Sequence, residues 1–465
     1  MLASKQNLDD LDPSNHGHIS TYSSRYFSQP TPKFEMPQRS IPANAAYQLV
    51  HDELNMDGNQ SLNLASFCTT WMEPEANKLI AENINKNFID HDQYPQTEVI
   101  HQRCVNMIAR LFNSPKDKKS VGTATIGSSE AIMLGLLAHK WRWINRRKKQ
   151  KKKFDKPNIV FGADVHVCWD KFAKYFDVEP RIIPMEVGRY IIGPKEVARR
   201  IDENTICVGA ILGTTFTGQY DDIEGINNHL LKIKQQKGWD IPIHVDAASG
   251  GFIAPFVYPD MLWDFRLEQV KSINVSGHKY GLVYPGIGWL IFRDEEDVPK
   301  DIVFSVNYLG EEMPTYTLNF SRGSSMVIAQ YYNLIRLGRE GYSRIANNVI
   351  ANAEYLSKRL IDSGFFDTLN PTQLLPVVAV KLKEKHNFDL YDLSEKLRQR
   401  GWIIPVYSLP PNAEKIVIMR MVVRENFSRG MADILLKDFV NAGMKLGDTK
   451  TKRKIEKFTT RGRVC

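Results

Sequence analysis

The chain lacks most features that mark secreted, membrane-spanning or zinc-binding proteins. Its 465 residues include five cysteines and no CxxC pair, which argues against a structural zinc site or a disulfide framework and for a reducing compartment. No segment approaches the about 18 consecutive apolar residues of a membrane helix, and the opening stretch MLASKQNLDDLDPSNHGHIS has no apolar centre, unlike a signal peptide. We therefore expect a cytoplasmic protein with no integral membrane segment and no metal site.

A strong excess of one charge is also missing. Lys and Arg total 61 against 53 for Asp and Glu, and the net charge of +8 is mild for a chain of this length. The densest basic run, NRRKKQKKKFDK (145–156), follows an amphipathic helical pattern, so a solvated helix end explains it better than contact with a phosphate backbone. We expect no nucleic-acid partner; binding that survives physiological salt would revive that alternative.

The order of sequence patterns predicts four regions. Residues 1–60 are an N-terminal arm and helical segment, 61–345 a large domain, 346–446 a small C-terminal α+β domain, and 447–465 a basic tail. Within the large domain, short apolar runs without polar alternation are separated by helical patterns. They are NIVFGA, PRIIPM, CVGAILGTTF, IPIHVDA, SINVSG and GWLIFR. This pattern predicts an α/β fold with a mainly parallel sheet covered on both faces.

A small hydroxyl-rich turn opens one of the predicted helices. In TIGSSEA, Ser128 and Ser129 precede a strongly helical segment, and a helix N-terminus offers free N–H groups and small hydroxyl donors to a phosphate. Taken alone, Ser128 is more simply explained as a helix cap. The turn is therefore a candidate phosphate site that needs support from other residues.

Two further candidates follow buried strands. His166, in FGADVHVCWDKF, could stack on a flat ligand or move a proton, although a histidine between Val and Cys is more often a packing residue. Asp246 ends the strand of IPIHVDAASGGF, where ligands of open α/β sheets bind, although an acid there also commonly caps a helix.

The fourth candidate is Lys279 in SINVSGHKYG. It lies at the end of an apolar strand, and a desolvated lysine becomes an amine nucleophile able to form a Schiff base with an aldehyde. Pyridoxal phosphate requires such a lysine, an acid opposite its pyridinium nitrogen, a phosphate cup and a ring on its face. The four motifs together supply all of these, so we predict pyridoxal 5'-phosphate as the cofactor.

The motifs TIGSSEA, HVDAASGGF, WDFRL, SGHKYGL, NFSR and RLGREGY are similar to those of glutamate decarboxylase, of the type shared by bacteria and plants. The resemblance runs from about Pro42 to Leu446. It implies fold type I, the aspartate-aminotransferase fold, with a large seven-stranded-type sheet domain. It also implies a carboxy-lyase that converts L-glutamate to 4-aminobutyrate and CO2 and consumes a proton.

Matched position by position, the resemblance implies the cofactor contacts. Lys279 is the Schiff-base lysine, Asp246 the partner of the ring nitrogen, and His166 stands over the ring where the family usually has glutamine. The remaining cofactor-binding residues implied are Ser128, Ser129, Thr215, Ala248, Ser276, His278 and Ser321. In the family the counterpart of Ser321 reaches the phosphate of a neighbouring subunit, which implies at least a homodimer, with a hexamer as the larger alternative.

The same matching implies the substrate contacts. Ser66, Phe67 and Asp90 would hold the side-chain carboxylate of glutamate, and Arg420 the α-carboxylate. Asp90 facing a carboxylate would have a raised pKa, so substrate should bind best in mild acid. Tyr308, in NYLGEE, falls in a loop that would assist reprotonation.

The sequence leaves two other classes of protein function open. Another pyridoxal-phosphate enzyme, acting on a different amino acid or as an aminotransferase, is the nearest alternative, and a non-catalytic binding protein on the same fold is a second. Consumption of a proton makes acid resistance a reasonable physiological hypothesis, and amino-acid catabolism fits equally well.

Overall fold

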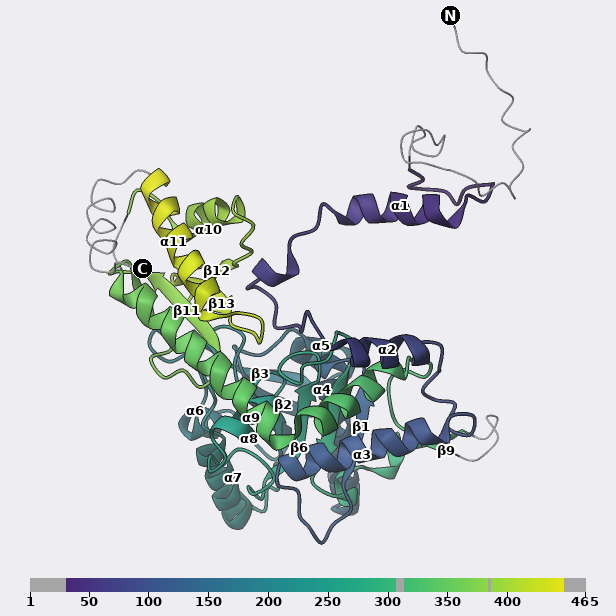
Figure 1. Cartoon of the computed structure of the whole chain (residues 1–465). Coiled ribbons are helices and arrows are strands. Elements are labelled where there is room, and N and C mark those ends of the chain that lie inside the picture. The colour runs from purple at the N-terminus through teal and green to yellow at the C-terminus, as the bar shows by residue number, and fades with distance from the viewer. Residues whose placement is uncertain (1–30, 307–312, 384–385, 447–465) are drawn as a thin grey trace, which may run out of the picture. The chain divides into compact units, whose positions relative to one another are not determined.

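The computed structural model describes residues 31–306, 313–383 and 386–446. The chain divides into two units, one ending at Leu62 and the other beginning at Asn63. The first contains helix α1 (Ala43–Leu54) and the single 3-10 turn η2 (Gln60–Leu62). The second contains both large sheets and all the site residues described below (Figure 1). None of the helices within the described ranges is long and apolar enough to cross a membrane.

A seven-stranded sheet forms the centre of the second unit, in the order β1-β7-β6-β5-β4-β2-β3. β7 runs antiparallel to its neighbours β1 and β6, and the other adjacent strands are parallel. The strands are β1 (Val121–Thr125), β2 (Asn158–Gly162), β3 (Glu179–Ile183), β4 (Thr205–Ile211), β5 (Ile243–Asp246), β6 (Val270–Ser276) and β7 (Gly288–Phe292). All six apolar runs singled out in the sequence are therefore strands of one sheet.

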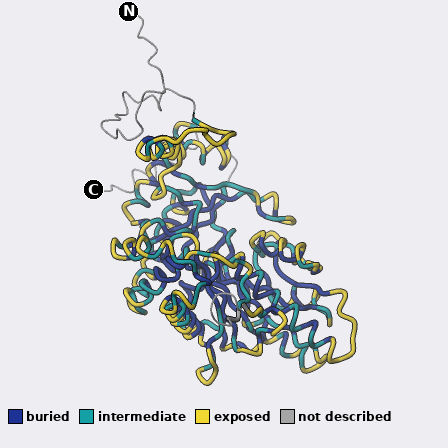
Figure 2. The backbone as a smooth tube through the Cα atoms, turned by 90° about the vertical axis from the view of Figure 1, so that its right-hand side faces the viewer, coloured by how far each residue is buried: buried dark blue, intermediate teal, exposed yellow. Residues whose placement is uncertain are grey.

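Burial explains why these strands show no polar alternation. Every residue of β2, β4, β5 and β7 is buried, since helices cover both faces of the sheet. Figure 2 shows this buried interior under a shell of exposed loops and helix surfaces.

Adjacent residues of β7 identify the two faces. Trp289 stacks on His101 of α3 (Pro95–Leu111), with ring centroids 5.9 Å apart. Leu290 packs against Leu134 of α4 (Ser128–Lys149). Because successive strand residues point to opposite faces, α3 and α4 cover opposite sides of the sheet. The other helices of this region are α2 (Pro74–Asn83), α5 (Cys168–Tyr175), α6 (Pro194–Ala198), α7 (Ile223–Lys237) and α8 (Ala254–Val257).

The long helix α9 (Ser325–Asp362) leads into a four-stranded antiparallel sheet of order β10-β11-β13-β12. Its elements are β10 (Phe366–Thr368), β11 (Val377–Leu382), α10 (Leu390–Arg398), β12 (Val406–Ser408), β13 (Val417–Val422) and α11 (Arg429–Leu446). The run WIIPVYSL (402–409) is rich in apolar and β-branched residues, a pattern that predicts one strand over its whole length. Only its last part forms, because Pro405 has no amide hydrogen to donate to the sheet.

α9 crosses the predicted boundary between residues 345 and 346. Its backbone turns at Gly338, where φ is +57°. The division into a large and a small domain stays a prediction. A two-stranded ribbon of β8 (Phe304–Val306) and β9 (Met313–Thr315) completes the unit.

Candidate active site

A cavity of about 380 Å³ lies at the carboxyl ends of the parallel strands. β1, β2, β4, β5 and β6 each end at it, which is where ligands of open α/β sheets bind. Nine predicted site residues line it: Ser128, Ser129, His166, Thr215, Asp246, Ala248, Ser276, His278 and Lys279. The fold therefore brings together residues that are spread over nearly a third of the chain.

Lys279 follows the end of β6 and directs its amine into the cavity. Its Nζ donates to Ser249 Oγ at 3.1 Å and lies 4.9 Å from the ring centroid of Phe67. Burial lowers the pKa of the Lys279 ammonium below its usual range, although the nearby Asp246 opposes this shift. The lysine is thus a more available amine nucleophile than one in water.

Asp246, the last residue of β5, is buried and held by three donors. Oδ1 accepts from the Asn274 side-chain amide at 2.9 Å and from the backbone N–H of Ala248 at 3.1 Å. Oδ2 accepts from Trp169 Nε1 at 3.3 Å. Donors on both oxygens fix the orientation of the carboxylate, as a partner for a protonated ring nitrogen requires.

The hydroxyl cup predicted for a phosphate is formed by two segments. Ser128 begins α4, and its Oγ lies 2.7 Å from the Oγ of Ser276 at the end of β6. Gly288 lets the segments approach, because a Cβ there would lie only 2.5 Å from the carbonyl carbon of Gly127. Free N–H groups at the start of α4 and this hydroxyl pair form a suitable anion site.

His166 lies between β2 and α5 at the edge of the cavity. Its Nδ1 accepts from the backbone N–H of Cys168 at 3.3 Å, which leaves the proton on Nε2. Burial lowers the pKa of this imidazole, and the charge of Asp246 only partly offsets that effect. A neutral ring beside the cavity suits stacking on a flat ligand and donation from Nε2.

Arg420 on β13 lies near Phe67, as Lys279 does. Its guanidinium carbon is 5.2 Å from the Phe67 ring centroid, and NH1 donates to the Thr215 carbonyl oxygen at 3.1 Å. NH2 donates to the carbonyl oxygen of Ala65, which precedes Ser66. Its Nε finds no hydrogen-bond partner in the described part of the chain, and no carboxylate pairs with it there. A buried cation with an unused donor is suited to an anionic ligand.

The segment that carries Ser66 and Phe67 is fixed to the lysine loop. Thr69 donates two bonds there: its N–H donates to the carbonyl oxygen of His278 and its hydroxyl to that of Lys279, both at 2.9 Å. The segment of Ser66 and Phe67, which is predicted to bind the substrate, therefore lies beside the lysine loop.

Asp90 and Ser321 are not brought to this cavity. Asn87 joins them instead: its side-chain amide donates to Asp90 at 3.3 Å, and its Oδ1 accepts from the N–H of Arg322 at 3.1 Å. The residues flanking Asp90 line a second cavity of about 390 Å³. Tyr308 lies outside the described residues.

Sequence reasoning missed several residues that contact the site. Ser249 accepts a hydrogen bond from the Lys279 amine. The run of small residues directly after Asp246 was the only sequence feature that pointed to it. Trp169 and Asn274 hold Asp246, and Asp164 lines the same cavity while 2% exposed. Asn274 left a trace in the sequence, because it is a polar residue inside an apolar strand. Nothing in the sequence pointed to Trp169 or Asp164.

Comparison with known proteins defines the class. Residues 37–383 match the family described as pyridoxal-dependent decarboxylase conserved domain. The chain belongs to this family, and the predicted cofactor and enzyme class are confirmed. The site fits pyridoxal phosphate, because a buried amine, a fixed carboxylate and a hydroxyl cup face one cavity.

Within that family the similar proteins share one description. The chain is 52% identical to a glutamate decarboxylase of Solanum lycopersicum, covering 94% of this chain and 87% of the relative. It is 45% identical to glutamate decarboxylase beta of Listeria innocua, covering 94% of both. The solved glutamate decarboxylase of Lactobacillus brevis has a TM-score of 0.89 at 42% identity, covering 91% of this chain and 97% of that one.

A more distant structure supports the fold alone. The sphingosine-1-phosphate lyase of Burkholderia pseudomallei has a TM-score of 0.76 at 20% identity, covering 94% of this chain and 98% of that one. The predicted type I fold with a seven-stranded sheet is confirmed.

Proposed function

We propose that the protein is a glutamate decarboxylase, which converts L-glutamate to 4-aminobutyrate and CO2 with uptake of one proton. The observation that carries the substrate assignment is the pair of cationic groups at the Phe67 ring: the amine of Lys279 lies 4.9 Å and the guanidinium carbon of Arg420 5.2 Å from its centroid. Beside this ring an amino acid can present its α-carboxylate to Arg420 while its amino group reaches the cofactor on Lys279. The identity to glutamate decarboxylases over most of the chain supports glutamate as that amino acid.

The resemblance assigns roles to the cofactor-binding residues, and their position around one cavity supports them. Lys279 would hold the cofactor covalently, Ser128, Ser129, Ser276 and His278 would bind its phosphate, Ala248 would pack under its ring, and Thr215 would lie near its phenolic oxygen. When bound, pyridoxal phosphate supplies an electron sink for the bond broken at Cα. Asp246 keeps the ring nitrogen protonated, and this strengthens the sink because a cationic ring accepts the electrons more readily.

The remaining residues orient the substrate and manage the proton. Arg420 directs the α-carboxylate so that the bond to be broken stands across the ring face, and Ser66 and Phe67 border the side chain of the substrate. His166 covers the ring, and its Nε2 proton is available to the cavity. Tyr308, predicted to assist reprotonation, remains a candidate. Uptake of a proton on each turnover supports a role in acid resistance.

We also propose that the active unit is at least a dimer. Ser321 and Asp90 lie together through Asn87 and apart from the lysine cavity of their own chain. If Ser321 reaches a neighbouring subunit, as the resemblance implies, Asp90 goes with it. Both residues would then complete the site of a partner copy.

The test is product analysis with purified protein and added pyridoxal phosphate. We expect release of CO2 and 4-aminobutyrate from L-glutamate between mildly acidic and neutral pH, and none from Lys279→Ala. L-aspartate and an aromatic amino acid are run in parallel. Turnover of one of those in place of L-glutamate would show that the substrate assignment is wrong, and transamination products would show a different reaction.

A further inference from the structure

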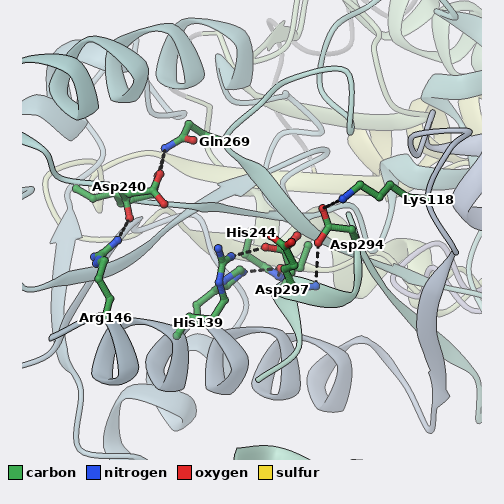
Figure 3. A network of polar contacts seen from close by, with 12 residues as sticks. Lys118, His139, Arg146, Asp240, His244, Gln269, Asp294 and Asp297 are labelled. Carbon is green, nitrogen blue, oxygen red and sulfur yellow. Dashed lines mark hydrogen bonds and ion pairs between the residues drawn. The ribbon is translucent and has the colours of Figure 1, made fainter. Parts of the chain in front are cut away.

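A continuous set of buried polar side chains lies behind Asp246. His244 and Asp246 point to the same face of β5, and Ser272 and Asn274 to the same face of the neighbouring β6. The register pairs His244 with Ser272 and Asp246 with Asn274, so the four side chains form a square on the sheet. His139 of α4 faces this square from above, and Figure 3 shows it directed toward His244.

The side chains are joined in sequence by short hydrogen bonds. His139 Nε2 lies 2.7 Å from Ser272 Oγ, and that oxygen lies 2.7 Å from His244 Nδ1. His244 Nε2 lies 2.8 Å from Asn274 Oδ1. His139, His244, Ser272 and Asn274 are all 0% exposed, so water cannot replace any of these bonds.

Asp246 sets the direction of every bond in the set. Its carboxylate only accepts, so Asn274 must turn its amide nitrogen toward it and its oxygen toward His244. His244 therefore carries its proton on Nε2, and Nδ1 accepts from the Ser272 hydroxyl. Ser272 then accepts from His139 Nε2. Both imidazoles are neutral in this arrangement, in accord with burial, which lowers the pKa of His244 to about 4 and holds that of His139 well below its usual range.

A glycine on α4 makes room for the central imidazole. A Cβ on Gly135, one turn before His139, would lie 2.8 Å from two ring atoms of His244. Glycine in a helix interior is destabilising relative to alanine. Gly135 lies where the ring of His244 packs against the backbone of α4, so a larger residue at this position would collide with that ring.

We propose that His139, Ser272, His244 and Asn274 act as positioning residues for the decarboxylation. They hold the Asp246 carboxylate in the orientation that the ring nitrogen of the cofactor requires. They also tie it to α4, the helix whose first residue, Ser128, belongs to the phosphate cup. The two ends of the cofactor site are thereby kept at a fixed separation. The inference rests on the proposed pairing of Asp246 with the ring nitrogen, and not on which amino acid is the substrate.

The network is first tested in the cofactor-free protein by nitrogen-15 NMR of the histidine rings. We expect His244 and His139 to be neutral with the proton on Nε2, and Ser272→Ala to alter the ring signals of both. A charged His244, or its proton on Nδ1, would overturn the proposed direction of the bonds. This readout does not depend on activity, so it stands even if a different substrate is found.

The second measurement is the affinity for pyridoxal phosphate and the nitrogen-15 shift of its bound ring. Ser272→Ala should raise the Kd for pyridoxal phosphate about tenfold and reduce protonation of the ring nitrogen. A tenfold loss of affinity is also typical when the partner that orients a metal-ligating histidine is removed. His139→Leu should act in the same direction, and His139→Gln, which keeps a donor near the position of Nε2, should restore the affinity.

A matched control separates positioning from stability. Thr205→Val removes a hydroxyl of equal burial on β4, where it bonds Asn158 far from the cavity. It should lower the melting temperature as Ser272→Ala does and leave both cofactor readouts unchanged. Should Ser272→Ala and His139→Leu bind the cofactor as the wild type does, with the same ring shift, the network is structural only and the proposal is wrong.

Discussion

Ser128 and Ser276 place their hydroxyl oxygens 2.7 Å apart although 148 residues separate them in the chain. Ser128 begins α4, and Ser276 is the last residue of β6. Their contact therefore joins the segment that follows the edge strand β1 to the end of the strand that precedes Lys279. A cup formed before the ligand arrives needs little rearrangement to bind a phosphate, which favours affinity because less ordering is required on binding.

The first prediction concerns this cup. Ser128→Ala and Ser276→Ala should each weaken pyridoxal phosphate binding by about tenfold, since each removes a donor to a charged acceptor worth about 1.5–3 kcal/mol. The double variant should lose less than the sum, because the two hydroxyls also bond each other. Titration of the cofactor-free variants measures the Kd. Ser114→Ala, a buried serine outside the cavity, is the control and should bind normally.

The second prediction concerns the amine of Lys279. Because burial lowers its pKa below the usual 10.5, the folded protein binds fewer protons than the unfolded chain between the two pKa values. The stability of the cofactor-free wild type should therefore rise with pH through that window, and Lys279→Met should remove this rise. Denaturant unfolding at several alkaline pH values measures the slope. The same variant should lack the near-visible absorbance of the lysine-bound cofactor while keeping the wild-type circular dichroism.

Much of this site was predictable because local sequence sets it. The apolar runs ending at Asp246 and Ser276 predicted buried strands, and parallel strands bring their carboxyl ends to one edge. Lys279, Asp246 and the turn that contains Ser128 each lie at or just after the end of a strand. A correct prediction of the strands therefore also locates these residues. The strand predicted over 402–409 was too long, and it contains Pro405, a residue whose effect on pairing could have been weighed beforehand.

Other parts depended on packing that a sequence does not reveal. His139 reaches Ser272 only because of the rotation of α4 on the sheet, which many side chains set together. Ser272 and Asn274 did leave a signal, two polar residues alternating in an apolar strand. The spacing of residues along the chain does not show that His139 is the partner of Ser272. The distance of Asp90 from the lysine cavity was equally hidden, because that residue is placed by its bond with Asn87.

The third prediction concerns Arg420. Arg420→Lys keeps a positive charge but loses the planar fork that can grip a carboxylate through two hydrogen bonds. We expect kcat/KM for L-glutamate to fall about 100-fold, equivalent to about 3 kcal/mol, with cofactor affinity within about twofold of wild type. Steady-state kinetics and cofactor titration measure the two effects. Arg266→Lys, whose arginine bonds Asp264 away from the cavity, is the control. An equal loss in that variant would point to general destabilisation instead.

The last prediction concerns Asp164, which lines the cavity and is almost fully buried. Burial raises its pKa to about 7, and the nearby Asp246 adds to the shift while Arg189 opposes it. The folded protein then holds this proton between the ordinary pKa of 3.8 and about 7, whereas the unfolded chain has released it. Stability of the cofactor-free protein should therefore decline as pH rises across that window and level off above it.

Asp164→Asn keeps the shape and removes the titration. Its stability should be less dependent on pH between 5 and 7 and higher than that of the wild type at pH 8, where the wild type must keep two neighbouring carboxylates ionised. Denaturant unfolding from pH 5 to 8 measures both. Asp222→Asn, at the exposed start of α7, keeps an acceptor for the N–H of Gly225 and should keep the wild-type slope. If the stability of Asp164→Asn depends on pH as steeply as that of the wild type, the prediction is wrong. Asp164 would then ionise near its ordinary pKa, and other groups in the cavity would stabilise its charge.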